Sequence, residues 1–266
     1  MAAAGAGGLA VTRLSGPEAP GATGCTFAPA GATVEFVLDP AQARYAAVIA
    51  AVALRMGLPD HAVTVALATA LRESGLRDLP YGDRDSVGLF QQRPSQGWGT
   101  RAELLDPVYA AAAFYERLAR QPGWAAVPVT VAAQAVQRSA TPRAYAAWAG
   151  EATVLASALT GGSPAAVTCR LAGFAGDAPP PSALEAAAAR EMGAQLIGAP
   201  LPAGLGWRVA AWAVAHAWSY HLRQVTFGSW EWTAGSGRWV DYDPAGVSSA
   251  GSNTVTVGYG THSSGT

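Results

Sequence analysis

The spacing of apolar residues divides the first two thirds of the chain into helices. Several of these segments open with a capping side chain followed by proline, which is a frequent helix start. This chemistry occurs at Asp39-Pro40, Asp106-Pro107 and Thr141-Pro142, while Asp60 is a further candidate cap and Thr100 to Glu103 has the pattern of a capping box. The pattern predicts helices near 40–57, 60–74, 100–105, 107–120, 130–138 and 142–160, and the alternation over 33–37 predicts a short strand.

A glycine-rich segment over 76–99 interrupts the helical rhythm. It contains Gly82, Gly88, Gly97 and Gly99 but few residues that favour helices. A long irregular loop inside a helical domain usually has a functional role.

The last third of the chain has a different pattern. Ser182 to Glu185 has the pattern of a second capping box that opens a helix, and Trp207 to His221 predicts another helix. Strands are expected over 223–232, 238–242 and 254–259, with a hairpin turn at 235–237. The chain is therefore predicted to be α+β, with a flexible segment over 1–30, a mainly helical domain over 31–162, a linker over 163–182 and a small α+β domain over 183–260.

Composition and charge exclude some classes of partner. Only 13% of the residues are charged and the net charge is −1, so the sequence lacks the basic character typical of nucleic-acid or anionic-membrane binding. The longest apolar run, Ala46–Leu54, is far shorter than the about 20 residues that cross a bilayer. No signal peptide is recognisable at the N-terminus, so either the chain is cytoplasmic or its export segment lies upstream of this sequence.

The two cysteines flank the predicted helical domain. A bridge between Cys25 and Cys169 would join the two ends of that domain, and two buried free thiols are the alternative. We favour the bridge, which implies an oxidising compartment and therefore an extracellular or cell-envelope location.

Glu73 is the leading candidate for an acid. The predicted helix over 60–74 is apolar on nearly every face, which predicts that it is buried. Glu73 lies in its last turn, just before the expected C-cap Gly75. Burial and the negative end of a helix both favour the protonated form of a carboxyl group, which is the form that glycoside cleavage needs. Taken alone, Glu73 is better explained as a helix-end residue that reaches solvent.

Two short motifs together resemble a known family. Glu73-Ser74 and Gly88-Leu-Phe-Gln91 resemble the paired signature of lytic transglycosylases and goose-type lysozymes, and the resemblance covers roughly residues 35–160. The stretches 86–99 and 132–139 also look like lysozyme-like domains of uncharacterised exported bacterial proteins. The resemblance implies a lysozyme-like fold for the first domain and the glycan strands of bacterial peptidoglycan as substrate.

The resemblance also implies roles for individual residues. Glu73 would be the general acid, Ser74 would orient it, and Gly88 would let the backbone approach the sugar. With the neighbouring residues of the loop added, the candidate substrate-binding residues are Ser74, Tyr81, Gly88, Gln91, Gln92, Trp98, Gln137 and Tyr145. Among them, Tyr81 and Trp98 are candidates to stack on sugar rings, and no metal or organic cofactor is implied.

The third motif of the family departs from its usual form. A Tyr-Asn pair usually positions the N-acetyl sugar, whereas the matching segment here is 135–139. Gln137 can replace the amide, and the tyrosine is missing unless Tyr145 supplies it from the next helix.

A second carboxylate remains an open question. Lytic transglycosylases use one acid because the N-acetyl group of the substrate stabilises the developing cation. Hydrolysing relatives use a hairpin aspartate to position water, and both Asp83 and Asp85 occur in that region. Turn chemistry better explains Asp83, while both roles stay open for Asp85.

The sequence therefore predicts a glycan-cleaving enzyme with Glu73 as acid and base. The alternative is a non-catalytic protein that binds peptidoglycan or assists envelope assembly, and the altered third motif favours it. An ion pair between Glu73 and Arg72, Arg77 or Arg84 would weaken the enzymatic hypothesis.

Trp230 and Trp232 alternate onto one strand face, which gives the last domain a possible aromatic surface for glycan, stem peptide or an envelope protein.

Overall fold

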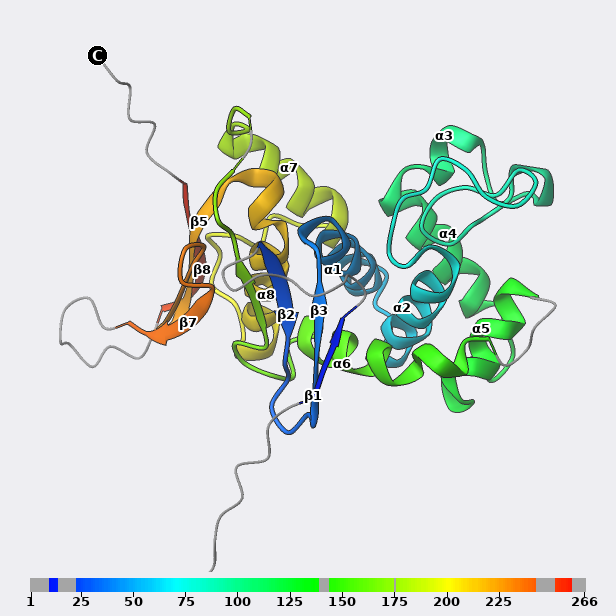
Figure 1. Ribbon diagram of the computed structural model, residues 1–266, viewed down its shortest axis with the longest axis horizontal. Helices are drawn as coiled ribbons and strands as arrows, with labels where there is room; N and C mark the ends of the chain where they lie inside the picture. Colours follow the sequence, from blue (N-terminus) through cyan, green and yellow to red (C-terminus); the bar gives the residue numbers. More distant parts are fainter. Residues whose placement is uncertain (1–9, 14–22, 139–143, 175, 243–251, 260–266) are drawn as a thin grey trace, which may run out of the picture.

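The computed structural model describes residues 10–13, 23–138, 144–174, 176–242 and 252–259 (Figure 1). Helices and two four-stranded sheets make up this part of the chain, as expected for the α+β class. The helices are α1 (Pro40–Arg55), α2 (Asp60–Ser74), α3 (Arg101–Leu104), α4 (Pro107–Ala119), α5 (Val129–Gln137), α6 (Ala149–Leu159), α7 (Pro181–Met192) and α8 (Ala203–Tyr220). Short 3-10 turns lie at Pro94–Gln96, Trp124–Ala126 and Ala146–Trp148.

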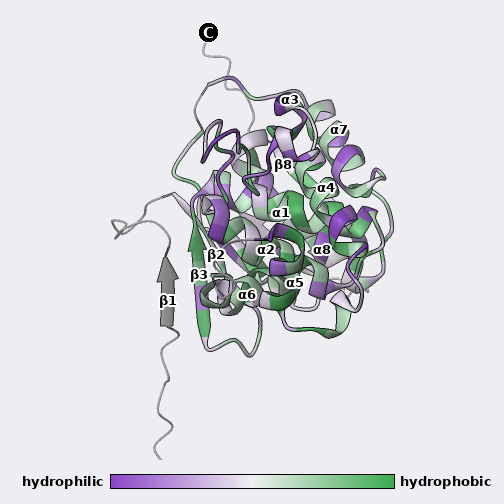
Figure 2. Ribbon diagram, turned by 90° about the vertical axis from the view of Figure 1, so that its right-hand side faces the viewer, coloured by the Kyte–Doolittle hydropathy of each residue, from purple (hydrophilic) through white to green (hydrophobic). Residues whose placement is uncertain are grey.

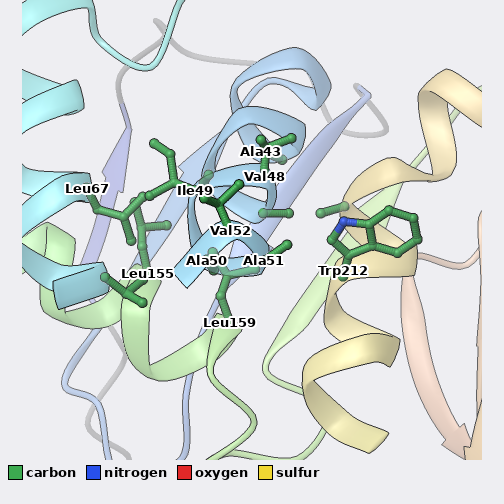
Figure 3. Packing of buried hydrophobic residues seen from close by; sticks show 14 of the residues in the cluster. Ala43, Val48, Ile49, Ala50, Ala51, Val52, Leu67, Leu155, Leu159 and Trp212 are labelled. Carbon is green, nitrogen blue, oxygen red and sulfur yellow. The ribbon is translucent and has the colours of Figure 1, made fainter. Parts of the chain in front are cut away.

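Helix α1 lies at the centre of the molecule. It is built mainly from alanine and valine, and it packs against α2, α4, α7 and α8. Figure 3 shows Leu67 and Leu155 on one side of α1 and Trp212 on the other. Figure 2 shows strongly apolar residues gathered around α1. The buried residues of the described chain form one continuous cluster, so the expected helical domain and the expected C-terminal domain share a single core.

Local capping chemistry begins several helices where the sequence indicates. The Asp39 side chain accepts from Gln42 N in a capping box, Thr100 and Glu103 form the expected box, and Asp106 accepts from Val108 N. Two other expectations were wrong: α2 and α7 are preceded by proline N-caps that make no side-chain hydrogen bond. Asp60 instead pairs with Arg208 at 2.9 Å, because the packing of α8 brings that guanidinium to the start of α2.

The start of α6 also differs from expectation. The helix begins at Ala149, after a 3-10 turn, rather than near residue 142. The expected cap at Thr141-Pro142 lies outside the described residues.

The first sheet joins both ends of the helical region. Its strands are β1 (Ala10–Arg13), β2 (Gly24–Phe27), β3 (Val34–Leu38) and β4 (Val167–Arg170), in the order β1-β3-β2-β4. Strand β1 runs parallel to β3, and the other pairs are antiparallel. The expected linker therefore contains a strand, and the expected flexible N-terminal segment contains two, because pairing with distant strands stabilises these short segments.

The expected disulfide is present between Cys25 and Cys169. The two residues lie directly opposite each other on β2 and β4, and both are buried. The bridge closes a sequence separation of 144 residues.

The second sheet packs one face on α8. It contains β5 (Leu222–Gly228), β6 (Trp230–Thr233), β7 (Arg238–Asp241) and β8 (Ser252–Tyr259), in the order β7-β6-β5-β8 and antiparallel throughout. The expected strand over 223–232 is thus two strands, and the expected turn at 235–237 joins β6 to β7. Trp232 is fully buried, so Trp230 and Trp232 do not form the expected exposed aromatic surface. The rings of Phe227, Trp230 and Trp239 instead pack edge-on around Trp207 of α8.

Within the described residues, none of the helices has the length and apolar character needed to cross a bilayer.

Removing the disulfide should weaken the fold. We expect the Cys25→Ala/Cys169→Ala variant to lose about 2–5 kcal/mol of unfolding free energy, because the unfolded chain regains the entropy of a long open loop. Urea unfolding followed by circular dichroism measures the change. Reductant should destabilise the wild type but leave the variant unchanged, and equal unfolding midpoints for wild type and variant would contradict the expectation.

Candidate functional site

Glu73 lies where the sequence places it, in the last turn of α2. The helix ends at Gly75, whose φ of 62° is the left-handed conformation of a C-cap. The Glu73 side chain is half-buried, and its Oε1 accepts a hydrogen bond of 2.7 Å from the hydroxyl of Tyr145. Tyr145 is fully buried, so its ring is held in place by packing. The contact brings together two predicted site residues that are 72 positions apart.

Tyr145 comes from a turn before the Ala146–Trp148 3-10 turn, rather than from the helix that was expected over 142–160. Glu73 takes part in none of the ion pairs found among the described residues, and neither does Arg72 or Arg84. Arg77 pairs with Asp39 at 2.9 Å. The ion pair that would have weakened the enzymatic hypothesis is therefore not found in this part of the chain.

Two predicted site residues, Ser74 and Gln137, form hydrogen bonds to backbone carbonyls of the loop over 88–91. The Ser74 hydroxyl lies 2.7 Å from the Leu89 carbonyl and also 3.1 Å from the Ala70 carbonyl. The Gln137 side-chain amide donates to the Phe90 carbonyl at 2.9 Å. The buried carbonyls of the loop need partners, and these side chains supply them. Ser74 thus connects the end of α2 to the loop, and Gln137 connects α5 to it.

Local packing requires the glycine at position 88. Its φ is +77°, and a Cβ at this position would lie 2.2 Å from the Leu104 carbonyl oxygen. The end of α3 therefore requires glycine here, whether or not a sugar approaches. Gln91, with a φ of 47°, donates its side-chain amide to the carbonyls of Gly88 and Tyr81, at 3.2 and 3.3 Å.

Gln92 and Trp98 are directed into the core. Gln92 is 1% exposed and donates to the Ala110 carbonyl of α4 at 3.1 Å. Trp98 is 6% exposed, and the Arg117 guanidinium covers its ring at 3.5 Å from the ring centre. Neither side chain presents a face to a glycan in this structure, because the packing of the loop on α4 covers both. Tyr81, by contrast, is 70% exposed and available for stacking.

Asp85 locks the turn in which it lies. Its carboxylate oxygens accept from the Ser95 backbone N–H at 2.8 Å and from Arg93 Nε at 2.7 Å. The hydrogen bond from Ser95 and that from Arg93 hold the pKa of Asp85 well below its ordinary value. Asp83 is exposed, and its backbone carbonyl accepts from Ser86 N. Turn chemistry therefore accounts for both aspartates.

Sequence reasoning missed Asp78. Burial raises its pKa from 3.8 to about 6, Arg44 opposes this rise and Asp106 adds to it. Its Oδ1 is buried and has no hydrogen-bond partner among the described residues, and it lies 3.5 Å from the position that a Cβ on Gly88 would occupy. No signal in the sequence distinguishes Asp78 from the other aspartates of the loop.

A cavity of about 530 Å³ lies away from Glu73. It is bounded by the β2–β3 connection and by the face of α6 that carries Glu151 and Val154, and no predicted site residue lines it. We place the candidate chemistry at Glu73 rather than at this cavity, because volume alone supplies no reactive group. Within the described ranges, no group of three or more His, Cys, Asp or Glu side chains is placed to hold a metal ion.

Comparison with known proteins gives no independent assignment: no protein-family model matches the sequence, and no curated protein matches it.

Replacing Asp78 with asparagine should stabilise the protein near neutral pH. Because the pKa of Asp78 is raised in the folded state, the ionised carboxylate lowers the free energy of unfolding, and this cost is fully present above about pH 6. The cost vanishes below about pH 4, where folded and unfolded chains are both protonated. We expect a gain of about 1 kcal/mol at about pH 7.5, after allowing for solvent screening of a half-buried group.

Thermal unfolding of Asp78→Asn at several pH values measures this gain. The exposed Asp83 provides the matched control, Asp83→Asn, which should shift the midpoint little at any pH. A gain that is the same at about pH 4 and about pH 7.5 would show that charge burial at Asp78 is not the cause.

Proposed function

We propose that this protein cleaves the glycan strands of bacterial peptidoglycan, with Glu73 as the general acid and base. The observation that carries the proposal is the hydrogen bond from Tyr145 to Glu73. The third motif lacks a tyrosine at the expected place, and Tyr145 supplies a hydroxyl beside the acid from a later segment. This arrangement supports the lysozyme-like interpretation of the Glu73-Ser74 and Gly88–Gln91 motifs.

The contact suggests how the acid would work. With Oε1 accepting from Tyr145, the proton of the neutral acid is carried by Oε2. Glu73 would donate this proton to the glycosidic oxygen between N-acetylmuramic acid and N-acetylglucosamine as that bond breaks, while the substrate's N-acetyl carbonyl stabilises the cation. The hydrogen bond from Tyr145 would strengthen as Glu73 becomes a carboxylate, because hydrogen bonds to charged acceptors are stronger.

The second half of the reaction needs a nucleophile. The Glu73 carboxylate would take a proton either from water or from the sugar's own 6-hydroxyl. Both oxygens of Asp85 are engaged by Arg93 and Ser95, so Asp85 is poorly placed to activate water. We therefore favour the intramolecular route, which yields a 1,6-anhydro sugar.

A non-catalytic role in peptidoglycan binding or envelope assembly is the second candidate. It is favoured by the burial of Gln92 and Trp98 and by the use of Gln91 and Gln137 as loop contacts, since these leave fewer polar groups for a sugar. Both functions fit an extracellular or cell-envelope location, which the buried disulfide supports. With Trp232 buried, an envelope partner for the C-terminal part would have to use other residues.

Cleavage can be tested by mass spectrometry of purified peptidoglycan incubated with the protein. We expect anhydro-ended muropeptides from the wild type, and a loss of at least about 100-fold in Glu73→Gln, because the amide is not acidic enough to transfer a proton to the leaving oxygen. Glu116→Gln is the matched control, since Glu116 is exposed and forms a surface ion pair with Arg120. Reducing ends would indicate hydrolysis, and retained wall sedimentation without products would favour the binding role.

Tyr145→Phe tests the contact that supports the proposal. Removing the hydroxyl should lower kcat about 10- to 100-fold with little change in KM, which corresponds to a hydrogen bond to a charged group of about 1.5–3 kcal/mol. The buried ring is retained, so thermal unfolding should change much less than activity. Unchanged kcat in the folded variant would remove Tyr145 from the mechanism.

A further inference from the structure

The cavity of about 530 Å³ beside α6 plays no part in the proposed reaction. One of its walls is formed by the β2–β3 connection and the start of β3, and the other is formed by the exposed side of α6. Figure 1 shows α6 beside β3, and the two elements are in contact. The volume lies within the range of about 300–1,000 Å³ that is common for sites of small organic ligands.

The periodicity of the two elements explains how the cavity is lined. Alternation along β3 turns Val34 and Phe36 towards it. On α6, the lining positions Glu151, Val154 and Ser157 are three residues apart, which places them on one side of the helix. Apolar surface from both elements therefore surrounds a single acidic side chain.

The hairpin wall is held in place by contacts within the protein. Gly31 has a φ of 79°, a left-handed conformation that suits glycine at this turn. The Ala30 N–H donates to the buried Ser163 hydroxyl at 2.6 Å. The Ala28 N–H donates to the Ala166 carbonyl at 2.9 Å. These contacts tie the hairpin to the segment between α6 and β4, and a preformed wall lowers the entropy that is lost when a ligand binds.

Glu151 is the one charged residue among those that line the cavity. It is partly buried and lies in the first turn of α6, where the positive end of the helix favours a negative charge. Within the described part of the chain, its carboxylate takes part in no ion pair. Hydrogen bonds between a carboxylate and a cationic donor are among the strong ones, so a cation would gain most from this position.

Hydroxyl groups add further acceptors to the same space. Thr33 on the hairpin, and Thr153 and Ser157 on α6, also line the cavity. The Thr153 hydroxyl donates its hydrogen to the Ala149 carbonyl at 2.7 Å, so towards a ligand its oxygen can only accept. An ammonium group has three donors and no acceptor, which suits a carboxylate surrounded by hydroxyl oxygens.

We propose that this cavity binds a small organic cation. Its ammonium group pairs with the Glu151 carboxylate, and the apolar body attached to it packs against Val34 and Val154. Binding involves no covalent step. The site is separate from Glu73, and the proposal does not depend on glycan cleavage.

A matched pair of probes tests the requirement for charge. 2-Phenylethylamine carries an ammonium group at neutral pH, whereas 2-phenylethanol has a neutral hydroxyl in the same place. Amide NMR of the full-length chain during titration measures both the affinity and the place of binding. We expect the amine to shift the amides of Thr33, Val154 and Ser157, with a dissociation constant of about 1–10 mM for a probe of this size. The alcohol should bind at least about tenfold more weakly.

Three variants locate the interaction. Glu151→Gln should weaken binding of the amine at least about tenfold and leave that of the alcohol unchanged, because it removes the charge but keeps the size. Glu35→Gln is the matched control, since Glu35 lies on β3 but does not line the cavity, and amine binding should change less than about twofold. Ser157→Phe should abolish binding of both probes, because Ser157 is exposed and a ring there fills the cavity without entering the core.

Four results would overturn the proposal. The first three are an amine that causes no saturable shift at the cavity, equal affinities for the two probes, and an amine that binds Glu151→Gln as tightly as the wild type. The fourth is a set of shifts confined to the residues around Glu73. None of these results bears on glycan cleavage, which the analysis of muropeptides decides separately.

Discussion

The structure depends on covering α1 from every side. A helix made mainly of alanine and valine offers apolar surface all round, and its small side chains let neighbouring helices approach closely. Helices α2 and α4 cover part of α1, and α7 and α8 cover another part. The helix that carries Glu73 and the helix that supports the second sheet therefore rest on the same element, and the buried residues around them form one continuous cluster.

The candidate site illustrates a second constraint, which is that buried backbone groups require partners. Several polar residues of the lysozyme-like motifs satisfy the loop itself: Ser74 serves the Leu89 carbonyl, Gln137 serves that of Phe90, and Gln91 serves those of Gly88 and Tyr81. These contacts fix the conformation of the loop next to Glu73. The contact between Glu73 and Tyr145 is different, because it joins a carboxyl group to a hydroxyl group and both groups can take part in proton transfer.

Much of the helical framework was predictable because its signals are local. Asp39 and Asp106 cap the helices that follow them, and Gly75 ends α2, within a few residues of the pattern that indicates each boundary. Features that depend on distant partners were not predictable. Strand β4 is only four residues long and exists through pairing with β2, and the inward direction of Trp98 is set by packing against α4. The Tyr145–Glu73 hydrogen bond likewise depends on how α2 and the segment before α6 pack together.

The disulfide turns the chain between residues 25 and 169 into a covalent ring, and both Glu73 and Tyr145 lie within it. A single peptide-bond break anywhere in that ring leaves the two fragments joined. Among the described residues, the exposed segment around Tyr81 is accessible to a protease, and loops with small and polar residues are preferred cleavage sites. In a denaturing gel without reductant, a molecule cut there would still migrate as one chain, and the two fragments would separate only after reduction. In the folded protein, the core would hold the segments on either side of the cut in place.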